Sequence, residues 1–392
     1  MFWKKTFLNK KIALICDIGS ASVGISICDF ASKIPNVLLS TRIPISIQNN
    51  FNATELESLA VSFFNEAVKL VDDSRKKNFL SQFAGHIDVV HIFFSSPWYV
   101  AKNSSVQVVK EKPFLLDQHE LEEIIRKEEK KFQDDLRNTK TIVELGDIAV
   151  IERELLSVKL NGYETKNPIL KKATDIDLSL FMSVAPHRFI QNFFNKLSST
   201  FHTTQVFAHA FPLAVYRSML LVNPHEKRYL FLDIAGEMTD IIMVYDGIIQ
   251  YSGSFSLGRN ELVREISRSL SEPFEVVLSL LSLYSNKSLD DEMTKKIDSA
   301  VQNFLKNWRN EIEQILKTNN ESTDFPQRVF VTVDDDVSFV FLRALKNATA
   351  DERSVFQLTN TIVQNAISYD KHVIRDPFLA LEAISVQYFL QK

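Results

Sequence analysis

The feature that most constrains the fold of this chain is a β-hairpin pattern that occurs twice. In the first copy an apolar strand ends in Asp17-Ile18-Gly19-Ser20, and in the second copy it ends in Asp233-Ile234-Ala235-Gly236. A turn of small residues follows each strand, and a second apolar strand then returns. Hairpins of this kind, alternating with helical segments, indicate α/β architecture with two related halves.

Glycine is scarce in the chain, and its placement supports this interpretation. Only nine of the 392 residues are glycine, about 2% where an average protein has roughly 7%. Most of them lie in or just after the two hairpins: Gly19, Gly24, Gly236, Gly247, Gly253 and Gly258. Turns with small side chains expose N–H groups that can hold phosphate oxygens without a Cβ in the way. We therefore expect Gly19 and Gly24 to let the first turn approach a phosphate, whereas plain hairpins that need glycine for a positive φ are the alternative.

An Asp at the end of each first strand suits a hydrated metal ion. Mg²⁺ prefers one or two carboxylates together with phosphate oxygens and water, so Asp17 and Asp233 are the candidate metal ligands. Two such turns facing each other across a cleft would hold a triphosphate from both sides. The chain contains neither GxxxxGK[ST] nor GxGxxG, which argues against a P-loop and a dinucleotide site.

Composition excludes several other classes of protein. The net charge is −4, and basic residues are interleaved with acidic ones, so we expect no nucleic-acid partner. Cys16 and Cys28 are the only cysteines, which argues against a disulfide framework and a zinc site. No apolar run approaches the roughly 18 residues of a membrane span, and the early run IALIC is too short for a signal peptide. We expect a cytoplasmic protein.

The motifs resemble those of a known superfamily. DIGSASVGISI, which starts at Asp17, is similar to the first phosphate motif of the actin/Hsp70/sugar-kinase superfamily, and DIAGEMTDI, which starts at Asp233, is similar to the second. Within it the chain resembles the bacterial FtsA/PilM group of actin-like ATPases. NGYETKNP and TDIDLSLFMSVAP resemble the inserted 1C (SHS2) subdomain of that group, GRNEL at 258–262 resembles its ribose segment, and DPFLA at 376–380 its return to the first domain.

This resemblance implies a two-domain actin-like (ribonuclease H-like) α/β fold with a 1C-type subdomain inserted in the first domain. The expected parts are subdomain 1A at 10–104 and 189–228, the 1C-like insertion at 105–188, subdomain 2A at 229–264 and 326–392 with the return to 1A, and subdomain 2B at 265–325.

The resemblance also implies a site for ATP and Mg²⁺. Asp17 and Asp233 would approach Mg²⁺ through water. The family pattern implies that backbone groups of Gly19, Ser20, Ala21 and Ser22 hold one side of the phosphates and Gly236 the other. It also implies that Thr239 lies near the terminal phosphate, and that Asn260 and Glu261, in the segment that Gly258 opens, lie near the ribose.

Two departures from the family pattern weaken this site. Ala235 and Glu237 replace small residues of the second motif, and a carboxylate near a γ-phosphate would repel it. Relatives place two glycines after the strand at 328–333, where this chain has Asp334-Asp335-Asp336. Asp336 is suited to cap a helix that begins near Val337, but three carboxylates beside a polyphosphate would oppose its binding. We therefore expect at most a weak ATPase, and assign no catalytic residue.

Several functions remain open. The first is an ATP-binding adaptor like FtsA, which would link a membrane-associated division complex to the tail of a tubulin-like division protein through nucleotide-dependent self-assembly. The second is a PilM-like part of type IV pilus assembly that binds the tail of an inner-membrane pilus protein. NGYETKNP and DPFLA favour FtsA, whereas the lack of a C-terminal amphipathic anchor after residue 392 favours PilM.

Two further functions and one weak membrane contact are also compatible with the sequence. A scaffold that has kept the fold and lost the nucleotide is suggested by Asp334-Asp335-Asp336. A small-molecule kinase ranks last, because the 1C-like insertion replaces the expected substrate domain. Aromatic and basic residues at 1–11 could contact the inner face of the cell membrane, but so short a segment would bind weakly.

Overall fold

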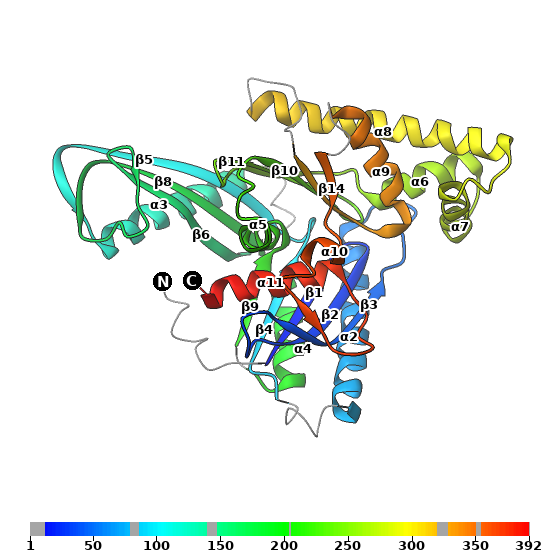
Figure 1. Ribbon diagram of the computed structural model, residues 1–392, viewed down its shortest axis with the longest axis horizontal. Helices are drawn as coiled ribbons and strands as arrows, with labels where there is room; N and C mark the ends of the chain where they lie inside the picture. Colours follow the sequence, from blue (N-terminus) through cyan, green and yellow to red (C-terminus); the bar gives the residue numbers. More distant parts are fainter. Residues whose placement is uncertain are drawn as a thin grey trace.

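The computed structural model describes residues 12–78, 86–138, 147–203, 205–319, 328–349 and 354–391. Three β-sheets with helices packed against them make up the described chain, as Figure 1 shows, so the predicted α/β class is confirmed. No helix in these ranges is long and apolar enough to cross a membrane. The predicted membrane contact at 1–11 lies outside the described residues.

The first sheet contains the first of the two hairpins. Its strands, in the order β15-β3-β2-β1-β4-β9, are β15 Ser368–Tyr369, β3 Asn36–Pro44, β2 Ser22–Asp29, β1 Ile12–Ile18, β4 Val89–Phe94 and β9 Val206–Ala210. β1 pairs antiparallel with β2 and parallel with β4. Central strands of such a sheet are covered on both faces, which explains the continuous apolar run of β1.

Two pairs of helices pack with this sheet. α2 contacts α4, and α5 contacts α11. The helices of this part are α2 Ala53–Asn78, α4 His187–Phe201, α5 Phe211–Val222, the short α10 Asn360–Val363 and α11 Pro377–Gln391. α11 begins at a proline, which suits the first turn of a helix, and it brings the end of the chain back against β1 and β2.

The second sheet repeats the arrangement of the first. Its strands, in the order β12-β11-β10-β13-β14, are β12 Ile248–Phe255, β11 Thr239–Tyr245, β10 Tyr229–Ile234, β13 Val329–Val333 and β14 Val355–Gln357. β10 pairs antiparallel with β11 and parallel with β13, just as β1 pairs with β2 and β4. The internal repeat read from the two hairpins is therefore a repeat of topology.

Four helices accompany the second sheet, and with it they enclose a core of their own. They are α6 Arg259–Leu270, α7 Phe274–Ser285, α8 Asp291–Asn319 and α9 Asp335–Ala348. Trp308 of α8 is fully buried in this core beside Phe341 of α9. Burying one side chain of this size is worth about 1.5–3 kcal/mol or more, so α8 is held firmly to the rest of the domain.

The third sheet stands apart from the other two. Its strands, in the order β5-β8-β6-β7, are β5 Val100–Leu116, β8 Lys171–Pro186, β6 Ile148–Leu160 and β7 Tyr163–Glu164. The amphipathic helix α3 Gln118–Asn138 packs on β5. This sheet projects at one end of the molecule, opposite the end that carries α7 and α8 (Figure 1). Asn103 of β5 donates a hydrogen bond to the Ile249 carbonyl of β12 at 2.5 Å, which ties the third sheet to the second.

Candidate functional site

The turns of the two repeated hairpins meet in a narrow hollow between the first and second sheets. Residues from both hairpins, β3, the segment after β4, the segment before α9 and the start of α11 line it: Asp17, Gly19, Ser20, Ala21, Ser22, Arg42, Ser95, Asp233, Ile234, Ala235, Gly236, Asp334 and Phe378. The structure thus brings both candidate metal ligands, the whole first turn and Gly236 together. Thr239, Gly258, Asn260 and Glu261 do not line the hollow.

The two turns contact each other directly. The backbone N–H of Glu237 donates a hydrogen bond to Ser20 Oγ at 2.9 Å. Gly236 lies so close to the first turn that a Cβ on it would stand 2.7 Å from the Ala21 nitrogen, which no side chain could occupy. Glycine at position 236 therefore allows the second turn to pack directly against the first turn.

Backbone groups of the first turn are bonded within the protein. The N–H of Gly19 donates to the Ser22 carbonyl at 3.0 Å, and the Ala21 carbonyl accepts from the Ile45 N–H at 2.7 Å. Trp98 Nε1 donates to the Gly19 carbonyl at 3.1 Å. These bonds fix the turn from three sides, so its conformation needs no ligand.

Arg42 of β3 occupies the side of the hollow where a metal ion was predicted. Its Nη2 donates to Asp17 Oδ2 at 2.7 Å, and its Nε donates to Asp376 Oδ2 at 2.5 Å. Nη1 donates to Ser22 Oγ at 2.8 Å, and the guanidinium lies 5.0 Å from the Phe378 ring centroid. Sequence reasoning missed Arg42, although a lone cation in one strand opposite a glycine of the preceding strand was a usable signal.

Gly24 provides the space for this arginine. In the β2–β3 pair, Gly24 is the residue directly opposite Arg42. A Cβ on Gly24 would stand 2.7 Å from Arg42 Nη2. The expectation that Gly24 serves a phosphate is therefore replaced by a different role, which is to let the guanidinium lie flat across β2 and reach Asp17.

Burial and charge act against each other at Asp17. Burial raises the pKa of Asp17 to about 6, although Arg42 lowers it, and Asp376 and Asp334 add to the rise. Burial alone would lower the pKa of Arg42, but Asp376 and Asp17 raise it well above its usual value. Arg42 is therefore charged at neutral pH and is bonded to two carboxyl groups, those of Asp17 and Asp376.

Asp233 is the second candidate metal ligand and is buried more deeply. Its Oδ1 accepts from Thr332 Oγ1 at 2.7 Å, and its Oδ2 has no hydrogen-bond partner among the described residues. Burial, reinforced by Asp240, raises the pKa of Asp233 well above its ordinary value. Burial and the neighbouring Asp240 therefore disfavour the charged form of Asp233.

The side chain of Glu237 is buried and does not point to solvent. Its side chain is only 3% exposed and forms an ion pair with Arg264 of α6. Asn260 Nδ2 donates to Glu237 Oε1 at 2.8 Å, and Glu261 accepts from Arg264 Nε at 2.8 Å. The two residues predicted near the ribose are thus joined to Glu237 and Arg264, and Arg264 also donates to the Gln48 carbonyl of the first domain at 3.3 Å.

Thr239 and Gly258, both predicted in the nucleotide site, are packed inside the second domain. Thr239 is fully buried; its Oγ1 donates to the Leu257 carbonyl at 2.6 Å and accepts from Trp308 Nε1 at 3.0 Å. Gly258 precedes α6, and a Cβ on it would stand 2.5 Å from the Ala235 carbonyl oxygen. Gly258 is therefore required for the close packing of α6 on the second turn.

The acidic triplet is arranged differently from the prediction. α9 begins at Asp335, and Asp334 stands at its N-cap position, so the expected cap at Asp336 is wrong. Asp336 instead forms an ion pair with Arg259, and Arg259 also lies 3.5 Å from Asp334. Asp334 lines the hollow, where burial raises its pKa. One carboxylate of the three therefore faces the place predicted for a polyphosphate.

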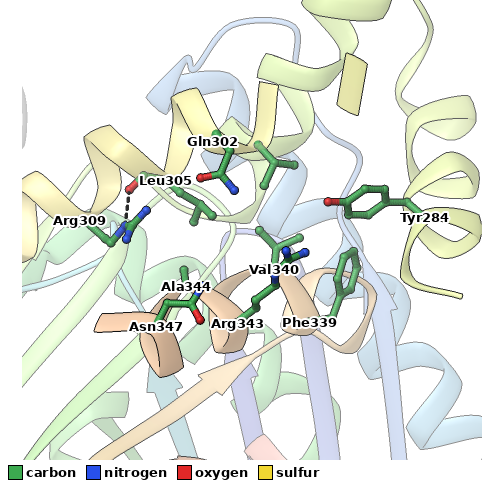
Figure 2. Close-up of a pocket in the computed structure, with 10 residues that line it drawn as sticks. Tyr284, Gln302, Leu305, Arg309, Phe339, Val340, Arg343, Ala344 and Asn347 are labelled. Atoms are coloured by element: carbon green, nitrogen blue, oxygen red, sulfur yellow. Dashed lines mark hydrogen bonds between the residues drawn. The ribbon is translucent and has the colours of Figure 1, made fainter. Parts of the chain in front are cut away.

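A second hollow lies between α7, α8 and α9 and contains none of the predicted site residues. Figure 2 shows Tyr284, Gln302, Arg309 and Arg343 around it. Tyr284 donates a hydrogen bond to Asp298, and burial together with that bond raises the pKa of Tyr284 to about 12. Arg309 is turned back to the Leu305 carbonyl, as the dashed line shows.

Comparison with known proteins identifies the fold. No protein-family model matches the chain, and no protein of curated function matches it in sequence. Among solved structures it is similar to a chain of the PilM–PilN type IV pilus biogenesis complex, at 14% identity and a TM-score of 0.63, with 97% of this chain and 98% of that chain covered. Ethanolamine utilization protein EutJ from Carboxydothermus hydrogenoformans is similar at 11% identity and a TM-score of 0.47, covering 96% and 89%. The chain therefore has the predicted two-domain actin-like fold, while a specific tie to FtsA stays a prediction.

The residues present do not fit a Mg·nucleotide. Asp17 is engaged by Arg42, and a divalent cation about 4 Å from a guanidinium would be opposed by roughly 8 kcal/mol at the effective dielectric constant of a protein surface. The two turns that were predicted to hold the phosphates from both sides contact each other directly. No group of three or more His, Cys, Asp or Glu side chains in the described ranges is arranged to hold a metal ion. The unpartnered Asp233 oxygen favours a cation, whereas burial and the neighbouring Asp240 disfavour the charged form of this carboxyl group.

Proposed function

We propose that this protein is an actin-like scaffold that binds a protein partner in a PilM-type assembly and works without ATP. The observation that carries the proposal is the ion pair of Arg42 with Asp17 and Asp376, which fills the place of the predicted metal ion. The likeness to the PilM–PilN complex, over nearly the whole of both chains, supports a role in type IV pilus assembly. On this proposal the protein is cytoplasmic and acts at the inner face of the membrane.

An FtsA-type adaptor is the second candidate. The DPFLA segment favours it in sequence, but the structure gives this segment a structural use: Asp376 Oδ1 accepts from the N–H groups of Phe378 and Leu379 at 3.0 and 3.1 Å. Its other oxygen holds Arg42. The segment thus caps α11 and positions the arginine, and both uses are independent of a role in division.

Nucleotide binding is tested by calorimetric titration of the purified full chain with Mg·ATP at neutral pH. We expect no heat of binding up to millimolar concentration, since the turns are in contact and Asp17 is occupied by Arg42. Saturable binding that an Asp17→Ala, Gly236→Val variant loses, while staying folded by circular dichroism, would contradict the proposal and restore the ATP-dependent adaptor.

Partner choice is tested by titrating the same protein with two synthetic peptides. One is the cytoplasmic tail of a PilN-type protein from the same cell, and the other is the C-terminal tail of its tubulin-like division protein. We expect binding of the first with equal affinity in the presence and absence of Mg·ATP. Binding of the second alone would favour the FtsA-type adaptor, and binding of neither would reject both candidates.

A further inference from the structure

We propose that Arg42 is a built-in counter-ion that permanently replaces the divalent cation of this cleft. The inference rests on the proposed function, in which the cleft works without Mg·ATP, and goes further by predicting that removal of Arg42 alone opens a site for a divalent cation. Arg42 is the one cationic side chain among the described residues that line the hollow, whereas Asp17, Asp233 and Asp334 all line it.

The arginine is held as a ligand would be held. Its guanidinium donates to Asp17 of β1, to Ser22 at the start of β2 and to Asp376 before α11, so three separate elements converge on one group. A planar guanidinium with five fixed donors suits such a constellation, and it cannot lose its charge at any pH the protein meets. A Cβ on Gly24 would stand 2.7 Å from Arg42 Nη2, so glycine at this position leaves room for the guanidinium.

The acidic surroundings require a positive charge at this place. Besides the two carboxylates that Arg42 bonds, the fully buried Glu382 of α11 lies nearby: burial raises its pKa well above the usual value, and the neighbouring Asp17 adds to that rise. Both carboxyl oxygens of Glu382 are without a hydrogen-bond partner in the described structure. Removal of Arg42 would leave Asp17 and Asp376 facing each other with no counter-charge.

Those two carboxylates form, without the arginine, the kind of ligand pair that a hydrated Mg²⁺ or Mn²⁺ accepts. Arg42→Met keeps much of the volume of the side chain and removes the charge, and Arg42→Gln also keeps one donor. The inference therefore predicts that either variant gains a response to divalent cations that the natural protein lacks.

The experiment compares the full-length natural protein, Arg42→Met and Arg42→Gln at about pH 8, where carboxylates compete well with protons. Thermal unfolding is followed with and without about 10 mM MgCl₂, and Mn²⁺ binding is measured by the loss of its free-ion electron paramagnetic resonance signal. An Asp17→Asn, Arg42→Met double variant is the matched control, because it removes the cation and one of its carboxylate partners together.

We expect both single variants to bind Mn²⁺ at least about tenfold more tightly than the natural protein and to melt at a higher temperature in MgCl₂. The double variant should lose most of this gain. Mn²⁺ binding by the natural protein in this cleft, lost in the Asp17→Asn single variant, would overturn the inference. So would single variants that gain no response to the cation, including variants that fail to fold both with and without it. Neither result depends on the partner-peptide titrations, so this inference can fail while the proposed scaffold function stands.

Discussion

Gly24 and Arg42 face each other across the β2–β3 pair, and the missing Cβ of the one leaves the space that the guanidinium of the other fills. The glycine of the first hairpin is thus explained by a contact within the protein. The same holds for Gly236, which packs on the first turn, and for Gly258, which packs on the second. In a chain so poor in glycine, each of these three positions is one where a Cβ would clash with a neighbour, within one half of the molecule at Gly24 and Gly258 and between the halves at Gly236.

A Gly24→Ala substitution tests this relationship. The added methyl group would displace the guanidinium from Asp17, and we expect a loss of about 1–3 kcal/mol in the free energy of unfolding, measured by urea denaturation. The control is the same substitution in the Arg42→Met background, where no guanidinium is displaced and the loss should be smaller. Equal losses in the two backgrounds would show that Gly24 is needed for another reason.

Glu237→Gln tests the buried ion pair between the second turn and α6. The side chains of Glu237 and Arg264 are 3% and 6% exposed. We expect a loss of about 3 kcal/mol in unfolding free energy, because the charge of Arg264 is then poorly compensated in a buried place. Glu292→Gln removes an exposed i,i+4 pair with Lys296 and should change stability by no more than about 0.5 kcal/mol. A Glu237 variant as mild as this control would contradict the assignment.

The sequence predicted the fold better than the site. The two Asp-ending hairpins sufficed to predict repeated α/β halves, because a strand, turn and return strand are local features that apolar patterning fixes. Seven of the predicted nucleotide residues do meet in one hollow: Asp17, Gly19, Ser20, Ala21, Ser22, Asp233 and Gly236. Motif spacing could place these residues together, since each lies at the end of a central strand or in the turn beside it.

What the sequence could not predict is how those residues are paired. Arg42 meets Asp376 across more than three hundred residues, and Arg264 reaches Glu237 from the next helix. Such ion pairs depend on register and on side-chain direction, and a strand shifted by one residue would point Arg42 to the other face. Only the three-dimensional structure therefore distinguishes a site that is open to a metal ion from a site whose carboxylates are already paired with an arginine.

The pH dependence of stability is predicted from Asp240. This residue accepts hydrogen bonds from Ser96 N and Oγ of the first domain, and burial raises its pKa to about 6 from 3.8. Between these values the folded protein keeps a proton that the unfolded chain releases. The contribution of Asp240 to the free energy of unfolding is therefore present below about pH 4 and falls, by about 3 kcal/mol in total, as the pH rises to about 6. Asp17 contributes with the same sign over the same window.

Asp240→Asn removes this titration. Urea denaturation of the natural protein and the variant at a series of pH values gives the difference in unfolding free energy between them. We expect this difference to change across pH 4–6 in favour of the variant, because the variant no longer loses stability as the carboxyl group ionises. A difference that does not vary with pH, or that varies in the opposite direction, would contradict the buried-acid assignment of Asp240.

The attachment of the third sheet is predicted to depend on one buried arginine. Arg217 of α5 is 2% exposed and donates to Glu152 and Glu154 of β6 at 2.6 and 3.0 Å. Glu152 also accepts from His209 Nδ1, at 2.9 Å, and from the Ala210 N–H, so this strand is fixed to the first sheet through buried polar side chains. Arg217→Met would leave Glu152 buried with little compensation, and we expect a loss of about 3–5 kcal/mol.

Hydrogen exchange shows which part of the molecule loses stability in Arg217→Met. Amides of β6 should exchange faster in Arg217→Met, while those of β10 in the second sheet should keep their protection, because the arginine joins only the third sheet to the first domain. Arg153→Met is the matched control, since Arg153 lies on the same strand and forms an exposed pair with Glu129 at 3.0 Å. Faster exchange throughout the molecule, or the same effect in the control, would show that the Arg217 network does not hold the third sheet in particular.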